Sequence, residues 1–144
     1  MAEETRPIAP RANGEASIGT SDLKWGKGCF VEISNLDILN MAYDSTAVVN
    51  INVIGELDIT GSFHVIDTYN SQATDNLTTI NGGEAGDLLL LKLNDNNRVI
   101  TFKHNAGNIK FQTGQDYVLN TIDKIMLLAY TGETWLYVGD ISSG

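Results

Sequence analysis

Basic residues and cysteine are scarce in this chain of 144 residues. Nine Lys and Arg stand against 18 Asp and Glu, which gives a formal net charge of −9. Because proteins bind DNA by neutralising phosphates with Lys and Arg, this balance argues against nucleic acid as a partner. The single cysteine, Cys29, excludes an internal disulfide, and we expect synthesis and folding in a reducing cytoplasm.

Long apolar segments are also missing. The longest unbroken apolar run, Ile125 to Tyr130, is far shorter than the ~20 residues that a membrane-spanning helix needs. Residues 1–20 lack a basic segment followed by an apolar one, so the sequence predicts no secretory signal there. We therefore expect no membrane partner.

Helical periodicity is the third absence. No segment of about a dozen residues places apolar side chains at i, i+3, i+4 and i+7, as an amphipathic helix does. From about Gly28 onward, segments rich in β-branched and aromatic residues alternate with Gly- and Asn-rich turns such as Gly61-Ser62. This spacing predicts an all-β fold, with a compact sandwich- or barrel-like body of short antiparallel strands. The expected strands are residues 31–33, 47–54, 57–60, 63–67, 88–93, 99–103, 109–111, 117–119, 125–130 and 135–138.

The first 30 residues differ from the rest in charge and in apolar content. Their four basic and four acidic side chains cancel, so residues 31–144 carry the whole net charge of −9. Residues 1–16 hold no apolar side chain larger than alanine or proline except Met1 and Ile8. Such a stretch buries too little surface to offset its ordering entropy. We predict an extended N-terminal docking arm at residues 1–30 and a β-rich body at residues 31–144.

Two expected strands, 88–93 and 125–130, are apolar on both faces. A small sheet with one wet face does not require this pattern. Leaving several Leu and Ile side chains in water would cost roughly several kcal/mol, which is comparable with the about 5–15 kcal/mol net stability of a domain. These strands need cover from a second sheet together with the arm, or from neighbouring subunits. Oligomerisation is the simplest of these answers.

Residues with catalytic or metal-binding potential form no specific pattern. His64 and His104 lie far apart and have no Cys or Glu at zinc-ligand spacing, so each is interpreted as a structural histidine. An ion on a trimer axis is the one metal alternative. Glu56 and Asp58 face the same side of a strand, as a glycosidase pair would, but ordinary surface charge explains them more simply.

Two further candidates have similarly simple explanations. The run Asp95-Asn96-Asn97 offers oxygen ligands suited to calcium, but a hairpin turn explains the same residues. Cys29 has no partnered His or Asn to activate it and is interpreted as a small apolar side chain. We therefore expect no catalytic residue, no metal site and no cofactor, and we do not expect an enzyme.

The turn-then-Trp stretch at residues 17–28 and a set of strand-like segments between residues 86 and 138 resemble bacteriophage virion proteins. Ser17 to Gly28, in which Trp25 follows a turn, is similar to the lead-in of some phage appendage domains. A longer stretch resembles a β-rich module of phage tail fibres, spikes and head appendages, which is commonly a trimer. Its matching segments are residues 86–93, 98–104, 108–111, 123–128 and 135–138.

This resemblance implies a structural role in a phage particle. Tail fibres that bind hosts are usually much longer, and a small acidic body behind a neutral arm suits a capsid decoration, or cement, protein. The expected partners are the major capsid protein and further copies of the chain in a homotrimer, and the expected location is the outer capsid surface of the virion. A short tail-fibre or appendage component and a host-glycan-binding module are the alternatives.

Docking residues are expected in the arm. Trp25 follows a segment too polar to form its own core, so we predict that it anchors the arm to the body or to a neighbouring subunit, with Ile18 and Leu23 beside it. Arg6 and Arg11 are candidates for ion pairs with an acidic capsid surface, and solvated charge is their alternative. Trp135, in the last expected strand, is interpreted as a core residue.

Overall fold

The computed structural model describes residues 47–142, and in this range the secondary structure is β apart from one short 3-10 turn at Tyr69–Ser71. The all-β prediction is therefore confirmed. The predicted boundary between arm and body at residue 30 and the expected strand at residues 31–33 lie outside the described residues. The strands are β1 (Val48–Asn50), β2 (Glu56–Asp58), β3 (Phe63–Asp67), β4 (Thr74–Leu77), β5 (Thr79–Asn81), β6 (Leu88–Leu93), β7 (Val99–Phe102), β8 (Ile109–Lys110), β9 (Tyr117–Leu119), β10 (Lys124–Tyr130) and β11 (Trp135–Ser142).

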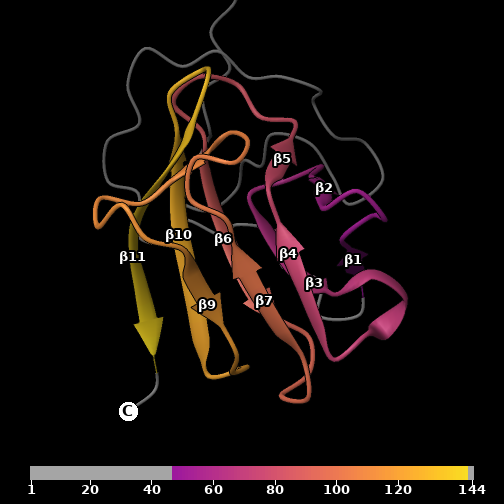
Figure 1. Ribbon diagram of the computed structural model, residues 1–144. Helices are drawn as coiled ribbons and strands as arrows, with labels where there is room; N and C mark the ends of the chain where they lie inside the picture. The colour runs from indigo at the N-terminus through magenta and orange to yellow at the C-terminus, as the bar shows by residue number, and fades with distance from the viewer. Residues whose placement is uncertain (1–46, 143–144) are drawn as a thin grey trace, which may run out of the picture. The chain divides into compact units, whose positions relative to one another are not determined.

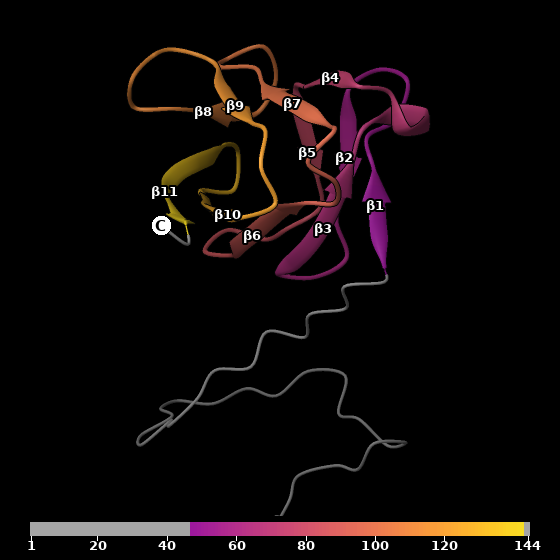
Figure 2. The ribbon, with the colours of Figure 1, turned by 90° about the horizontal axis from the view of Figure 1, so that it is seen from below.

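These strands form three sheets. The largest has the order β1-β3-β6-β10-β11-β8, the second β4-β7-β9, and the smallest β2-β5. In both ribbon views, β3, β6 and β10 lie on one side of the body and β4, β7 and β9 on the opposite side (Figures 1 and 2). The apolar core lies where these sheets face one another.

Parallel ladders wind the first part of the body into a coil. Strand β1 pairs with β3, and β3 with β6, in parallel, while β2 pairs with β5 and β4 with β7 in the same sense. The chain thus returns to each sheet after passing through another, and successive turns stack. The last part closes the coil differently, because β9 and β10 run antiparallel to β7 and β6, and β11 runs antiparallel to β10.

The expectation of antiparallel strands needs a correction. Among the described ladders, only β6–β10, β10–β11 and β7–β9 are antiparallel; the other ladders, including β8–β11, are parallel. Gly- and Asn-rich turns are equally suited to a hairpin and to a corner that carries the chain into another sheet. The turn signals therefore located strand ends without indicating strand direction.

Strand bounds also differ from the sequence-based expectation. The segment expected as one strand at residues 47–54 ends at Asn50, because the Asn52 side chain accepts hydrogen bonds from the backbone N–H groups of Ile54 and Glu56 (3.0 and 2.9 Å) and forms a turn. Strands β4 and β5 were not expected, since the Thr- and Asn-rich residues of β4 look like a loop. Each joins a parallel ladder whose partner lies more than 20 residues away in the sequence.

Side chains in register along the ladders fill the core. Leu57 and Ile80 are ladder partners, as are Leu77 and Phe102, and all of them are buried. Trp135 is fully buried, donates its indole N–H to the Ile80 carbonyl (3.3 Å) and stacks on Tyr130 with 4.6 Å between ring centroids. The interpretation of Trp135 as a core residue is thus confirmed.

The backbone at Gly107, in the turn before β8, lies very close to the backbone of Thr78. A Cβ atom at this position would lie 2.3 Å from the Thr78 carbonyl oxygen and 2.5 Å from Thr79 Oγ1. The adjacent Asn108 side chain exchanges two hydrogen bonds with the backbone of Ile80, accepting from its N–H (2.9 Å) and donating to its carbonyl (2.8 Å). Because residue 107 is a glycine, the chain comes close enough to β5 for the Asn108 side-chain amide to pair with the Ile80 backbone.

Gly107→Ala is expected to lower the free energy of unfolding by about 1–3 kcal/mol, because the new methyl group overlaps a backbone atom that cannot move aside. Urea denaturation followed by circular dichroism measures the change. Gly61→Ala is the matched control, since a Cβ there comes no closer than 3.9 Å to another group and should change little. Equal stability of the two variants would contradict the close approach.

Candidate interaction surface

The large sheet carries a second apolar side, which faces away from the core. Along β6 and β10, buried residues such as Leu89, Leu91 and Met126 alternate with residues that point outward. We call the outward side of β1, β3, β6, β10 and β11 the outer face. Ladder register arranges its side chains in three rows, Val48–Val65–Lys92–Ile125–Ile141, Phe63–Leu90–Leu127–Gly139 and Leu88–Ala129–Leu136.

Exposure on the outer face is lowest on β3 and highest on β11, although Leu88 on β6 is also 47 % exposed. Val65, on β3, is only 4 % exposed, whereas Leu136 is 42 % and Ile141 66 % exposed. Val138 is 58 % exposed and has no ladder partner, because a register shift between Leu127 and Leu128 leaves it in a bulge. Apolar side chains therefore reach solvent mainly along β11.

One charged residue, Lys92, stands within the three rows. It lines a shallow hollow of about 350 Å³ together with Asp123 and the apolar side chains of Ile122, Ile125 and Ile141. No metal-ligating or nucleophilic cluster stands in these rows. Apolar surface with one cation is suited to packing against another protein surface.

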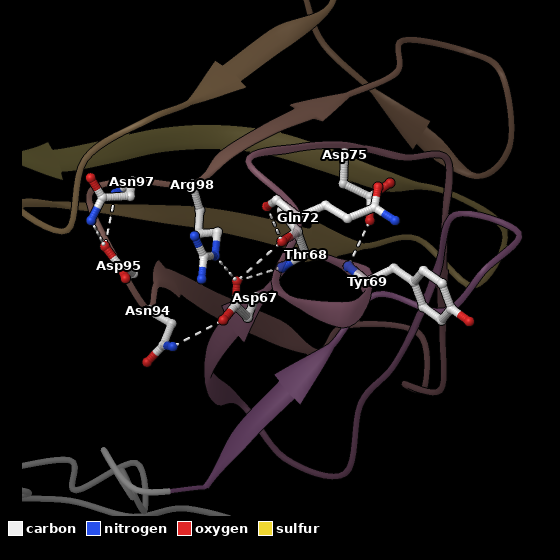
Figure 3. Close-up of polar contacts among 9 residues, drawn as sticks. All are labelled: Asp67, Thr68, Tyr69, Gln72, Asp75, Asn94, Asp95, Asn97 and Arg98. Atoms are coloured by element: carbon white, nitrogen blue, oxygen red, sulfur yellow. Dashed lines mark hydrogen bonds and ion pairs between the residues drawn. The ribbon is translucent and has the colours of Figure 1, made fainter.

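The most connected buried carboxylate lies at a corner of the coil (Figure 3). Asp67, at the end of β3, is 4 % exposed and accepts hydrogen bonds from Arg98 Nε (3.1 Å), Asn94 Nδ2 (3.1 Å) and the Thr68 N–H (2.7 Å). Asn94 follows β6 and Arg98 precedes β7, so the carboxylate joins two successive turns of the coil. With these donors in place, Asp67 acts as a structural tie.

Asp67→Ala is expected to lower the free energy of unfolding by about 2–3 kcal/mol, because it leaves Arg98 and Asn94 without their acceptor. The value lies below that of a fully buried ion pair, since the Arg98 side chain is 20 % exposed. Chemical denaturation measures it, and Glu133→Ala, at an exposed turn, is the control that should stay within about 0.5 kcal/mol. An equally small loss for Asp67→Ala would show that the tie contributes nothing.

The other residues that the sequence offered as catalytic or metal-binding candidates make local hydrogen bonds. Asn81 Nδ2 donates to both Glu56 and Asp58 (3.2 and 3.0 Å), so this pair does share one side of β2 but is bridged by an amide. Asp95-Asn96-Asn97 does form a turn, because Asp95 Oδ1 accepts from the N–H and Nδ2 of Asn97 (both 2.8 Å). The expected hairpin is wrong, because β6 and β7 on either side of this turn belong to different sheets. Within residues 47–142, no group of three or more His, Cys, Asp or Glu side chains is placed to hold a metal ion.

Both histidines make local hydrogen bonds, as the structural interpretation predicts. His64 Nε2 lies 3.1 Å from the Gly61 backbone nitrogen, and His104 Nδ1 accepts the N–H of Phe111 (3.0 Å). His64 is buried on the core side of β3, whereas His104 lies in the turn after β7.

A hollow of about 440 Å³ lies beside Trp135 and is lined in part by Thr60, Ser62, Glu84 and Asp87. Sugar-binding sites typically offer an exposed aromatic ring, but Trp135 has no exposed surface. Asp87 Oδ2 accepts the backbone N–H of Glu84 (2.7 Å) and so shapes the turn before β6.

Among residues 47–142, no helix is long and apolar enough to cross a membrane.

A cluster of aromatic rings packs between β9 and β11. Tyr117 stacks on Phe111 (5.5 Å between centroids) and lies 5.2 Å from the Tyr137 ring. Lys124 Nζ lies 5.6 Å from the Tyr117 ring centroid and 3.3 Å from Asp140, which also accepts the Tyr137 hydroxyl. Burial and the Asp140 carboxylate raise the pKa of Tyr137, while the Tyr137 hydrogen bond lowers the pKa of Asp140.

Stability is expected to fall as the pH rises above about 10. Burial also raises the pKa of Tyr117, and the Tyr117 and Asp140 side chains raise the pKa of Lys124. Above the ordinary pKa values of tyrosine and lysine, the folded chain therefore holds more protons than the unfolded chain. The free energy of unfolding then falls as the pH rises. Thermal unfolding across this range measures the decline. Tyr137→Phe should make it shallower and Tyr69→Phe, outside the cluster, should not; identical profiles would contradict the assignment.

The predicted docking residues Arg6, Arg11, Ile18, Leu23 and Trp25 lie outside the described residues, as does Cys29. The two-sided apolar strands did indicate the middle of the outer face. Ile141 was missed because the last strand was expected to end at residue 138, whereas β11 continues to Ser142. The exposure of Val138 was missed because it depends on a bulge that has no sequence signal. Comparison of the chain with protein-family models and with curated proteins finds no match.

Proposed function

We propose that the protein is a non-enzymatic structural component of a bacteriophage particle. In this proposal it is a homotrimeric capsid decoration, or cement, protein that docks on the major capsid protein through residues 1–30 and stabilises the head. It acts on the outer capsid surface of the virion. The resemblance of its β-rich segments to phage appendage modules motivates the assignment to a phage.

The apolar outer face is the observation that carries the structural role. A monomeric surface rarely presents a continuous apolar sheet side, whereas an association surface commonly does. Leu136, Val138 and Ile141 are all more than 40 % exposed on one strand. An assembly that covers this strand removes the cost of leaving it in water.

The difference in net charge between the body and the arm supports separate roles for them in this proposal. Residues 47–142 contain five Lys and Arg and eleven Asp and Glu, so the described body carries 5 − 11 = −6. Residues 1–30 are neutral and contain Arg6 and Arg11. An arm with these cations can approach an acidic capsid surface that repels the body.

Co-sedimentation with undecorated capsids, together with the native mass of the purified protein, tests this function. We expect a mass of about three times the 15.6 kDa chain and binding to capsids. Trp25→Ala should lower capsid occupancy and leave the circular dichroism spectrum unchanged, because it removes the proposed anchor from the arm. Trp25→Phe keeps an aromatic ring and should retain most of the binding.

Four results would count against the proposal in different ways. A monomer that ignores capsids would overturn it as a whole. Binding to tails instead of heads would favour a short tail-fibre or appendage component, and selective binding on a glycan array would favour a host-glycan module. Unchanged occupancy with Trp25→Ala would remove the anchor role of that residue alone.

A further inference from the structure

We infer that Asn81 is a site of spontaneous deamidation and that Glu56 and Asp58 are the positioning residues that slow this reaction in the folded chain. Asn81-Gly82 is the one Asn-Gly pair within residues 47–142. An asparagine before glycine deamidates most readily, because glycine has no side chain to shield its backbone nitrogen. The inference concerns the chemistry of the body and does not depend on the proposed function.

Deamidation at this pair proceeds through a succinimide ring. The Gly82 backbone nitrogen attacks Cγ of Asn81 and loses its proton, the Cγ–Nδ2 bond breaks, and the side-chain nitrogen leaves as ammonia. Water then adds to one of the ring carbonyl groups and opens the ring. The product is an aspartyl residue or, where the chain continues through the former side chain, an isoaspartyl residue. Water is the only co-reactant, and no group is oxidised or reduced.

The corner after β5 requires the glycine that makes this pair reactive. Gly82 has a φ of +95°, in the left-handed region that residues with a side chain rarely adopt. A Cβ atom at this position would lie 2.8 Å from the Ile59 carbonyl oxygen and 3.2 Å from Ile59 Cγ1. Any other residue is therefore strained at position 82, so the fold keeps a susceptible bond after Asn81.

Contacts with β2 and with the residue after it hold Asn81 away from the ring geometry. Asn81 Nδ2 donates to Glu56 Oε2 (3.2 Å) and to Asp58 Oδ1 (3.0 Å), which draws the side chain over the neighbouring strand β2 (Figure 1). The Asn81 carbonyl accepts the N–H of Ile59 (3.0 Å), which fixes the peptide before Gly82. Ring closure needs Cγ and the Gly82 nitrogen on the same side of the Cα–C bond, which an extended strand residue does not provide. The reaction therefore requires local opening of β2 from β5.

The product of the reaction weakens the ladder that slows it. A carboxylate at position 81 no longer donates to Glu56 and Asp58, and it adds a third negative charge beside them. An isoaspartyl residue also adds a main-chain atom at the end of β5, so the carbonyl of residue 81 no longer lies opposite the Ile59 N–H. Each conversion thus loosens the β2–β5 ladder, and the loss of ammonia makes the change irreversible.

The first test compares the full-length chain with a synthetic peptide of residues 77–87 in the same mildly alkaline buffer. Mass spectrometry follows deamidation of Asn81 with time, and we expect the folded chain to react at least about tenfold more slowly than the peptide. Equal rates would show that the fold does not slow the reaction. An unreactive peptide would show that Asn81 is not a deamidation site, and either result overturns the inference.

Two double variants test the positioning residues. Glu56→Ala with Asp58→Ala removes both acceptors, and we expect Asn81 to react about tenfold faster than in the wild-type chain. Glu56→Gln with Asp58→Asn removes the same charges but keeps side-chain oxygens that accept from Nδ2, so it should keep the slow rate. A faster reaction in both variants, or in neither, would overturn the assignment of these hydrogen bonds.

Asp67→Ala controls for a general loss of stability. It weakens the fold at a different corner, so Asn81 should react at the wild-type rate if opening of β2 from β5 is local. Circular dichroism confirms that each variant is folded. A reaction as fast as in the Glu56→Ala, Asp58→Ala variant would show that global unfolding sets the rate and would remove the positioning role.

Asn81→Asp reproduces the aspartyl product and tests its consequence. We expect the ratio of unfolded to folded chain at neutral pH to rise about tenfold over the wild-type ratio, measured by urea denaturation. Asn81→Ala is the matched control, because it removes the same donor without adding a charge and should have the smaller effect. Equal stability of Asn81→Asp and the wild-type chain would contradict the loosening of the ladder.

Discussion

The stacking of successive chain turns in parallel ladders is the constraint on which the rest of the body depends. Because β1, β3 and β6 lie side by side in the same direction, every inward position of one turn lies against an inward position of the next. Pairs such as Leu77 and Phe102 exclude water only in this register. A shift of one residue would turn the apolar set of a strand outward, so the burial of each turn depends on its neighbours.

Polar side chains hold the corners that this stacking requires. A coil of short strands turns often, and each turn leaves backbone and side-chain groups that need partners. Asp67 joins the corners that follow β3 and β6, and Asn108 extends the β5 ladder through its amide. The body thus combines an apolar interior with polar ties at its corners, and its described His and Asp residues have structural partners.

The six-stranded sheet links this architecture to association. Its inner side belongs to the core, whereas its outer side repeats the same apolar composition without an opposing sheet from residues 47–142 (Figure 2). Hydrophobic burial has no direction, so the outer side gains from cover by another chain just as the inner side gains from the core. The proposed structural role in an assembly rests on this surplus of apolar strand surface, and the same proposal assigns a separate point of attachment to residues 1–30.

The sequence by itself determined the β class, most of the turn positions after β5 and the two-sided apolar character of β6 and β10, because these follow from local residue preferences and from a period of two. Only the tertiary structure decided that most ladders are parallel, that the polar segment Thr74–Leu77 is a strand, and that a bulge exposes Val138. Strand direction and register depend on partners more than 20 residues away, and no local pattern encodes which partner a strand takes.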